Sequence, residues 1–197
     1  MESSEKKSIE EMLEELRSFP FVYPDKLPAI PLYMDQVTSM MEELLSPTKR
    51  SGKDKLLTKT MINNYAKNHL LPPPEKKKYC RDHILMLAFI YYFKGFLSLQ
   101  DIQSLLEPLW KNYPAEGDAA QQAPDLQEIY KQVYAGKDAW FENQRSDILR
   151  AYKESRESFP ECKEQDREFL RTFYLICTLG ADIYLRKRIM EELIDQL

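Results

Sequence analysis

The chain has 197 residues, of which 43% are apolar and 30% charged, with five glycines and a net charge of −4. This composition is typical of a globular protein of one large or two small domains, and it argues against a disordered chain. The scarcity of glycine, beside many Leu, Glu, Lys, Met and Ala residues, argues against an all-β fold rich in tight turns. We therefore expect a mainly all-α fold.

The first 29 residues predict a short helix followed by a connector. Residues 5–17 place apolar side chains at helical spacing between acidic ones, which is typical of an amphipathic helix. The connector contains four closely spaced prolines: Pro20, Pro24, Pro28 and Pro31. Because proline cannot continue a helix and biases the residue before it towards extended conformations, we expect an extended segment here.

Residues 30–111 predict a domain of four helices. The apolar side chains recur at helical spacing over 33–45, 58–68, 82–94 and 99–110. A polar, basic loop separates the first two helices, a run of three prolines ends the second, and a basic connector over 76–81 precedes the third. Ser98 and Asp101 match a capping box at the start of the fourth helix.

Residues 112–125 are rich in Pro, Ala, Gly and Gln and predict a linker. The remaining region, 126–197, predicts helical structure up to about residue 152, a break at Phe159-Pro160, and a last helix over 166–195. We expect this region to serve dimerisation or sensing. The side chains that we expect the last helix to bury are Phe169, Leu170, Phe173, Tyr174, Cys177, Ala181 and Tyr184.

The charged side chains are distributed unevenly. Residues 49–81 carry ten basic and two acidic side chains, whereas residues 1–48 and 82–197 each have a net charge of −6. A polyanion is repelled by most of such a chain and attracted to its one basic segment. A solvated surface without a partner is the alternative interpretation of a charge run.

The helix predicted over 58–68 carries groups that can contact nucleic acid. Thr58 is a good N-cap, so the amides that follow it are placed to bind phosphate. Met61, Ile62 and Tyr65 recur at the spacing of a buried face. On the other side, Asn can pair with adenine edges, Thr can contact a thymine methyl group, and Lys can reach phosphate or guanine. The residues on that side are Thr60, Asn63, Asn64 and Lys67.

Two resemblances support this interpretation. A helix ending in Tyr65, the stretch Leu70-Leu71-Pro72-Pro73 and the later run 96–102 resemble the DNA-binding half of MerR-type regulators. More closely, 30–37, 57–65 and 76–79 resemble the DUF1836 (YkrK-like) family of uncharacterised bacterial proteins, over most of residues 27–110. The resemblance implies a MerR-like winged helix-turn-helix unit.

Some residues depart from the MerR-type pattern. Asn63 stands where an arginine is usual, His69 stands where a glycine is usual, and the wing is shortened to residues 75–78. The loop between the first two helices is also longer than the tight turn of an ordinary helix-turn-helix. The resemblance implies that the helix enters the major groove and that the basic connector holds the backbone. The predicted DNA-binding residues are Thr58, Lys59, Thr60, Asn63, Asn64, Lys67, Lys76, Lys77, Lys78, Tyr79 and Arg81.

The C-terminal region is rich in aromatic side chains on helical faces. A packed helical core or a dimer interface explains this density. The alternative is a pocket for a hydrophobic effector, as in some MerR-type regulators. The residues of that pocket would be Tyr130, Tyr134, Trp140, Phe173 and Tyr174.

The sequence does not suggest an enzyme. It contains no glycine-rich phosphate loop and no GxSxG or HExxH motif, and neither His69 nor His83 lies beside an obvious nucleophile. The three cysteines are widely scattered, which fits reduced thiols in the cytosol and offers no paired metal ligands. The longest apolar run, 84–93, is too short to span a membrane, and we see no signal peptide.

These observations predict a cytoplasmic transcription regulator without a cofactor or a metal. We expect it to bind duplex DNA as a homodimer, because one small recognition unit needs a second half-site for useful specificity. The alternative is a helical adaptor that binds an acidic protein partner through the same basic helix-turn-helix surface.

Overall fold

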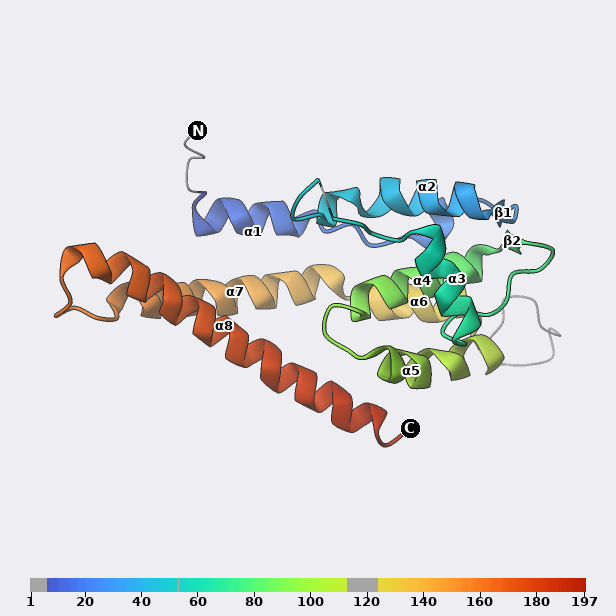
Figure 1. Ribbon diagram of the computed structural model, residues 1–197. Coiled ribbons are helices and arrows are strands. Elements are labelled where there is room, and N and C mark those ends of the chain that lie inside the picture. Colours follow the sequence, from blue (N-terminus) through green and yellow to red (C-terminus); the bar gives the residue numbers. More distant parts are fainter. Residues whose placement is uncertain (1–6, 53, 113–123) are drawn as a thin grey trace. The chain divides into compact units, whose positions relative to one another are not determined.

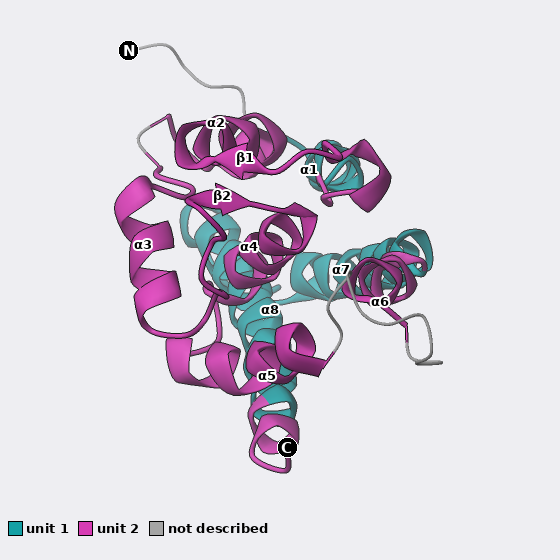
Figure 2. Ribbon diagram, turned by 90° about the vertical axis from the view of Figure 1, so that its right-hand side faces the viewer, with its two compact units in different colours: residues 1–19, 136–190 teal, residues 20–135, 191–197 magenta. Residues whose placement is uncertain are grey.

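The computed structural model describes residues 7–52, 54–112 and 124–197 (Figure 1). The chain divides into two compact units: unit 1 comprises residues 1–19 and 136–190, and unit 2 comprises residues 20–135 and 191–197 (Figure 2). As predicted, the fold is mainly α-helical, and one two-stranded ribbon is the only sheet in the described residues. No helix of this part of the chain combines the length and the apolar character needed to cross a bilayer.

Unit 2 is organised around helix α4 (Arg81–Phe93). Eight consecutive residues of this helix, from His83 to Ile90, are buried. A helix that is apolar on all sides must be surrounded by other elements. Accordingly, α4 contacts strand β2 (Lys78–Tyr79) and the helices α5 (Leu99–Asn112) and α6 (Leu126–Tyr134) (Figure 2).

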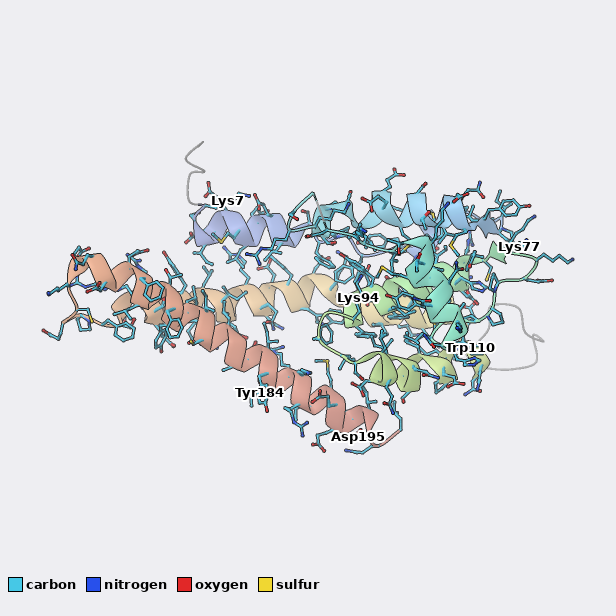
Figure 3. The ribbon with its side chains drawn as sticks, viewed as in Figure 1. Lys7, Lys77, Lys94, Trp110, Tyr184 and Asp195 are labelled. Atoms are coloured by element: carbon cyan, nitrogen blue, oxygen red, sulfur yellow. The ribbon has the colours of Figure 1, made fainter. Side chains whose placement is uncertain are left out.

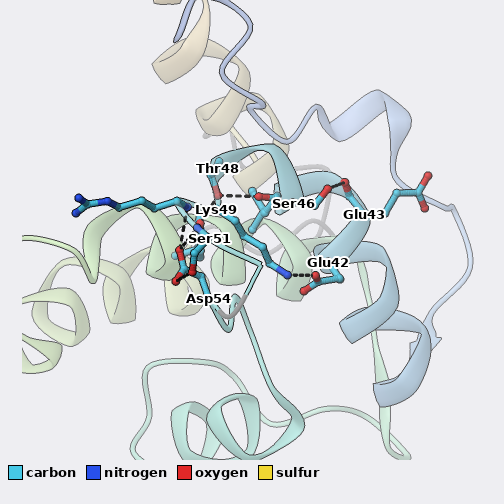
Figure 4. A network of polar contacts seen from close by, with 10 residues as sticks. Glu42, Glu43, Ser46, Thr48, Lys49, Ser51 and Asp54 are labelled. Carbon is cyan, nitrogen blue, oxygen red and sulfur yellow. Dashed lines mark hydrogen bonds and ion pairs between the residues drawn. The ribbon is translucent and has the colours of Figure 1, made fainter. Parts of the chain in front are cut away.

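Helices α2 (Met34–Leu45) and α3 (Lys59–Lys67) contact each other in the same unit. The chain leaves α2 through a short 3-10 helix, η2 (Ser46–Thr48). Asp54 then accepts hydrogen bonds from the N–H groups of Arg50 at 2.9 Å and Ser51 at 3.0 Å (Figure 4). Asp54 therefore holds the backbone at Arg50 and Ser51, in the first part of the long connection between the two helices.

Strand β1 (Leu32–Tyr33) pairs with β2 in antiparallel register, Leu32 opposite Tyr79 and Tyr33 opposite Lys78. This ribbon joins the segment before α2 to the segment before α4. A short 3-10 helix, η1 (Pro24–Lys26), lies in the proline-rich connector.

The predicted capping box at the start of α5 is confirmed. The N–H of Asp101 donates to the hydroxyl of Ser98, and the N–H of Ser98 donates to the carboxylate of Asp101, both at 3.1 Å. These bonds satisfy amides that the first helical turn leaves without partners.

Unit 1 contains helices α1 (Ile9–Arg17) and α7 (Lys137–Glu157), and most of α8 (Glu164–Ile194), up to Met190. Helix α1 packs on α7, where Arg17 forms an ion pair with Glu142 at 3.3 Å. Near the turn between α7 and α8, Arg156 pairs with Glu168 at 2.7 Å. Further from the turn, both helices line a groove of about 460 Å³.

Two sequence predictions differ from this structure. The helical region predicted from residue 126 to about 152 is interrupted at Ala135-Gly136, and α6 belongs to unit 2 while α7 belongs to unit 1. The N-terminal helix, predicted with residues 1–29 as a separate segment, belongs to unit 1 through its contact with α7. Most of the predicted linker, residues 113–123, lies outside the described residues.

The prediction that the last helix buries its apolar side chains is wrong. No residue of α8 is buried, and Phe169, Phe173 and Tyr184 are 70%, 54% and 63% exposed. The helical spacing of these residues is correct, but spacing alone cannot show whether another element covers the apolar face.

Candidate nucleic-acid interface

Helix α3 presents a row of polar side chains to solvent. Its first turn is capped by Thr58, whose hydroxyl accepts a hydrogen bond from the N–H of Met61 at 3.2 Å. Ile62 and Tyr65 are buried, and burial raises the pKa of the Tyr65 hydroxyl. The opposite side is exposed and consists of Thr60, Asn63, Asn64 and Lys67. The helix therefore has one face in the core and one polar face available for contact.

The C-terminal end of α3 turns sharply at His69, which has a φ of 58°. The N–H of Leu70 donates to the carbonyl of Tyr65 at 2.9 Å, and the N–H of His69 donates to the carbonyl of Ala66 at 3.3 Å. This pair of bonds is a Schellman motif, which favours glycine at the left-handed position. His69 therefore adopts a left-handed backbone angle that favours glycine.

The segment predicted as a shortened wing, residues 75–78, forms a tight hairpin. The N–H of Lys78 donates to the carbonyl of Glu75 at 2.8 Å, and the two residues between them, Lys76 and Lys77, have φ values of 49° and 64°. Positive φ at both central residues is the pattern of a type I′ turn, whose preferred residues are Asn and Gly. Two lysines in these positions cost conformational energy, because Cβ approaches a carbonyl oxygen.

Ion pairs neutralise only part of the basic segment. Lys59 pairs with Asp35, and Lys49 pairs with Glu42 (Figure 4). For three other lysines, no acidic partner lies at ion-pair distance within the described residues; they are Lys67, Lys76 and Lys77. Figure 3 shows Lys77 projecting from the hairpin into solvent. The positive charge is therefore retained at the end of α3 and at the hairpin tip.

Two predicted contact residues have structural roles instead. Tyr79 is only 3% exposed and packs edge-on against His83, with ring centroids 5.4 Å apart. The Arg81 guanidinium donates to the carbonyls of Pro28 at 3.1 Å and Leu27 at 3.0 Å. We therefore leave both residues out of the proposed interface. Lys78 is half-buried, with its ammonium 5.3 Å from the centroid of the Tyr33 ring.

A family model described as "Domain of unknown function (DUF1836)" matches residues 22–133, which is more than half of the chain. The chain belongs to this family. No curated protein and no solved structure matches it. The DUF1836 match nearly coincides with residues 20–135 of unit 2, so the family domain includes α6 as well as the region predicted at 30–111.

A groove of about 650 Å³ lies at the base of the hairpin in the DUF1836 domain. It is lined by residues of both charges, including Glu75, Lys76 and Lys78, and by the start of α4. There, the N–H of Cys80 donates to Nδ1 of His83 at 3.1 Å. Sequence reasoning missed this contact, because the capping-box pattern has Glu or Gln, not His, three residues after the N-cap. In the described residues, no group of three or more His, Cys, Asp or Glu side chains is placed to hold a metal ion.

The five residues of the predicted effector pocket fall into different units. In the DUF1836 domain, Tyr130 is 1% exposed and its ring centroid lies 5.0 Å from that of Phe89 and 4.6 Å from that of Tyr134. In unit 1, Trp140 and Phe173 are exposed, and Tyr174 is half-buried with an edge-on contact to Phe159. None of the five lines the groove at the hairpin or the groove between α7 and α8. The effector pocket therefore stays a prediction that neither of these two grooves supports.

Proposed function

We propose that the DUF1836 domain of this chain binds duplex DNA and that the protein is a dimeric, MerR-like transcription regulator. In this proposal α3 lies in the major groove and the hairpin over residues 75–78 lies on the adjacent phosphate backbone. The observation that carries the proposal is the exposed row of Thr60, Asn63, Asn64 and Lys67 on a helix whose other face is buried. The proposal includes no catalytic step.

The dimensions of α3 suit this role. A helix is roughly 10–12 Å across with its side chains, and the major groove is about 12 Å wide. From Thr60 to Lys67 the axis rises by about 10.5 Å, which corresponds to roughly three base pairs. A bidentate contact from Asn63 or Asn64 to an adenine would contribute about 1–3 kcal/mol of discrimination. Three base pairs specify too little sequence in a genome, so we infer that two copies read two half-sites.

The retained lysines supply affinity that is independent of sequence. Each phosphate neutralised by a lysine releases counterions, so log K falls by about 0.9 for each tenfold rise in salt concentration. Lys76 and Lys77 are exposed at the hairpin tip, and Lys67 is exposed at the end of α3. Three such contacts for each copy predict steep salt dependence.

The test measures binding of the full chain to fluorescent mixed-sequence duplexes between low and raised salt. Binding at low salt that weakens linearly with log salt supports the proposal. Absence of binding at low salt would rule it out and favour an acidic protein as the partner of the same surface.

Substitutions then distinguish side chains that contact bases from side chains that contact phosphates. Selection of genomic fragments by the wild-type chain and by the Asn63→Ala/Asn64→Ala variant compares their sequence preferences. We expect the variant to select fragments with relaxed preference while it keeps the salt slope, because amides do not neutralise phosphates. A loss of affinity that is equal for all duplexes, with a flatter slope, would contradict the assignment of these asparagines to base contacts.

A further inference from the structure

The groove at the base of the hairpin contains a thiol beside an imidazole. Cys80 and His83 both line this groove. The Sγ atom of Cys80 lies 3.0 Å from Nδ1 of His83, and Cys80 is exposed. A nucleophile within hydrogen-bond distance of a base is the arrangement that activates a thiol. The pair therefore has the geometry of a reactive, accessible cysteine.

His83 is placed to act as the base. It is 7% exposed, and its Nδ1 accepts a hydrogen bond from the N–H of Cys80 at 3.1 Å, so the ring proton is on Nε2. Burial lowers the pKa of the ring, and the carbonyls of Pro73 and Pro72 oppose this effect only in part. The imidazole is therefore neutral at neutral pH, and the lone pair of Nδ1 lies beside the thiol.

Structural hydrogen bonding does not account for a histidine at this position. Nε2 of His83 is buried and forms no hydrogen bond within the described residues. A buried polar atom without a partner costs about 1–3 kcal/mol, and such an atom needs an explanation. Glutamine would accept the same hydrogen bond from the N–H of Cys80. What the histidine adds is a titratable nitrogen beside the thiol.

The start of α4 stabilises a negative charge on the sulfur. Cys80 is the N-cap residue of this helix of 13 residues, and its Sγ accepts a hydrogen bond from the N–H of His83. The exposed amides and the positive end of the helix macrodipole favour a thiolate in this position. Cys177, by contrast, is exposed in the interior of α8, far from both ends of that helix. We therefore expect Cys80 to react faster than Cys177 in the same chain.

The groove has a size and a charge that suit a small anionic molecule. Its volume of about 650 Å³ lies within the range of small-ligand sites. Cationic side chains outnumber carboxylates in its lining, which includes Lys76, Lys78, Arg81, Glu75 and Asp82. The positive end of α4 adds to this excess. The groove therefore favours a thiol reagent that carries carboxylate groups over a cationic one.

We propose that Cys80 is a site of reversible thiolation by anionic disulfides of low molecular weight, with His83 as the base. The thiol proton passes to Nδ1, Sγ attacks one sulfur of the reagent, and the new S–S bond forms as the S–S bond of the reagent breaks. The proton then passes from Nδ1 to the departing thiolate, so the products are a mixed disulfide and one free thiol. Attack of a second thiol on the mixed disulfide reverses the reaction. This site goes beyond the proposed function, because the reaction does not involve DNA and is measured without it.

The first test measures the reaction of the full chain with oxidised glutathione. Mass spectrometry of the digested protein follows the mixed disulfides at Cys80 and Cys177 over time, so that Cys177 is the internal control. We expect Cys80 to react about tenfold faster or more, the lower range of general-base assistance. Equal rates at the two residues would overturn the proposal.

The second test removes the base. His83→Gln keeps an acceptor for the N–H of Cys80, so the start of α4 is retained, but the amide cannot take up the thiol proton. The rate at Cys80 should fall by about tenfold or more. The rate at Cys177 should not change, which shows that the fold is intact. An unchanged rate at Cys80 would refute the role of His83.

The pH profile separates a base from a structural residue. A thiol without a base reacts through its thiolate, whose fraction rises about tenfold between pH 6.5 and 7.5. The rate at Cys80 should rise by less than about threefold in the wild-type chain, because the proton acceptor is already beside the thiol. The His83→Gln variant should show the full tenfold rise. The same profile in both proteins would assign the histidine a structural role only.

The third test concerns the charge of the reagent. Cystamine is a cationic disulfide, and the ratio of the rates at the two cysteines corrects for its intrinsic reactivity. That ratio should be about fivefold higher with oxidised glutathione, in keeping with exposed ion pairs. Lys76→Asn/Lys78→Gln should remove most of this preference. Lys153→Gln/Lys163→Gln, which removes the same charge from exposed positions of unit 1, should keep it. The same ratio with both reagents would show that the groove does not select an anionic partner.

Discussion

The hairpin over residues 75–78 offers a substitution that should change stability and DNA binding in opposite directions. Lys76 and Lys77 occupy the two positive-φ positions of the turn, for which Asn and Gly are the preferred residues. The variant Lys76→Asn/Lys77→Gly therefore keeps the backbone geometry while it removes both charges. If the turn served folding alone, this change would be favourable, because it should increase the free energy of unfolding.

The expected gain in stability follows from the backbone. Left-handed φ costs an L-residue with a Cβ about 1 kcal/mol. Glycine, which has no Cβ, removes this cost at residue 77, and Asn, which tolerates the left-handed region better than Lys, reduces it at residue 76. Glycine offsets part of this gain, by about 0.5–1 kcal/mol, because its greater conformational entropy stabilises the unfolded chain. The free energy of unfolding should thus rise by roughly 1 kcal/mol, which corresponds to about 2–4 °C in Tm for a chain of this size.

The expected loss of DNA affinity follows from the charges. If each lysine neutralises one phosphate, the salt slope should fall by about 1.8 and the affinity at 0.1 M salt by roughly 60-fold. Thermal unfolding measures the first effect, and anisotropy with mixed-sequence duplexes measures the second. The control is Lys153→Gln/Lys163→Gln, which removes the same charge from exposed positions of unit 1. A hairpin variant that is less stable than the wild-type chain would refute the assignment of backbone strain to Lys76 and Lys77. A hairpin variant that binds DNA with the same salt slope as this control would refute their assignment to phosphate contacts.

Three further substitutions test the local structure of the domain. Thr58→Ala should lower the free energy of unfolding by about 1 kcal/mol, whereas Thr58→Ser, which keeps the hydroxyl, should not; urea unfolding compares them. His69→Gly should raise the free energy of unfolding by roughly 1 kcal/mol. A lower free energy of unfolding would show that the histidine side chain makes a contact that stabilises the fold by more than its left-handed backbone angle costs.

The third substitution tests a pH dependence. Burial lowers the pKa of His83, and the backbone carbonyls of Pro73 and Pro72 offset only part of that effect. The unfolded chain therefore takes up this proton at higher pH, and stability that is complete above about 6.5 should be lost as the pH falls towards the folded-state pKa. His83→Gln should flatten this loss between pH 7.5 and 5.5. An equally steep loss would assign the pH dependence to other groups.

Local signals in the sequence predicted much of the DUF1836 domain. The hydroxyl of Thr58 and the pair Ser98 and Asp101 act on amides within three residues, so the helix starts could be predicted from residue type and spacing. The same holds for the buried and exposed faces of α3. The position of His69 was also informative, because a residue in place of a usual glycine has to adopt its backbone angle.

The interactions that the sequence could not predict join distant segments. Arg81 was assigned to DNA because it ends a basic run, but it binds carbonyls 53 and 54 residues earlier in the proline-rich connector. Tyr79 was assigned to the same surface, but its pairing opposite Leu32 in the ribbon turns it into the core. For α8, the sequence identified apolar faces correctly and offered no information on what covers them.

The pairing of β1 with β2 has a mechanical consequence for the DUF1836 domain. Lys78 lies at the base of the hairpin and is paired with Tyr33, the residue that immediately precedes α2. A force that draws the hairpin tip towards a ligand is thus transmitted across the ribbon to the first turn of α2. The hairpin and α2 are therefore mechanically coupled, and we expect a bend of the hairpin to tilt α2 as well.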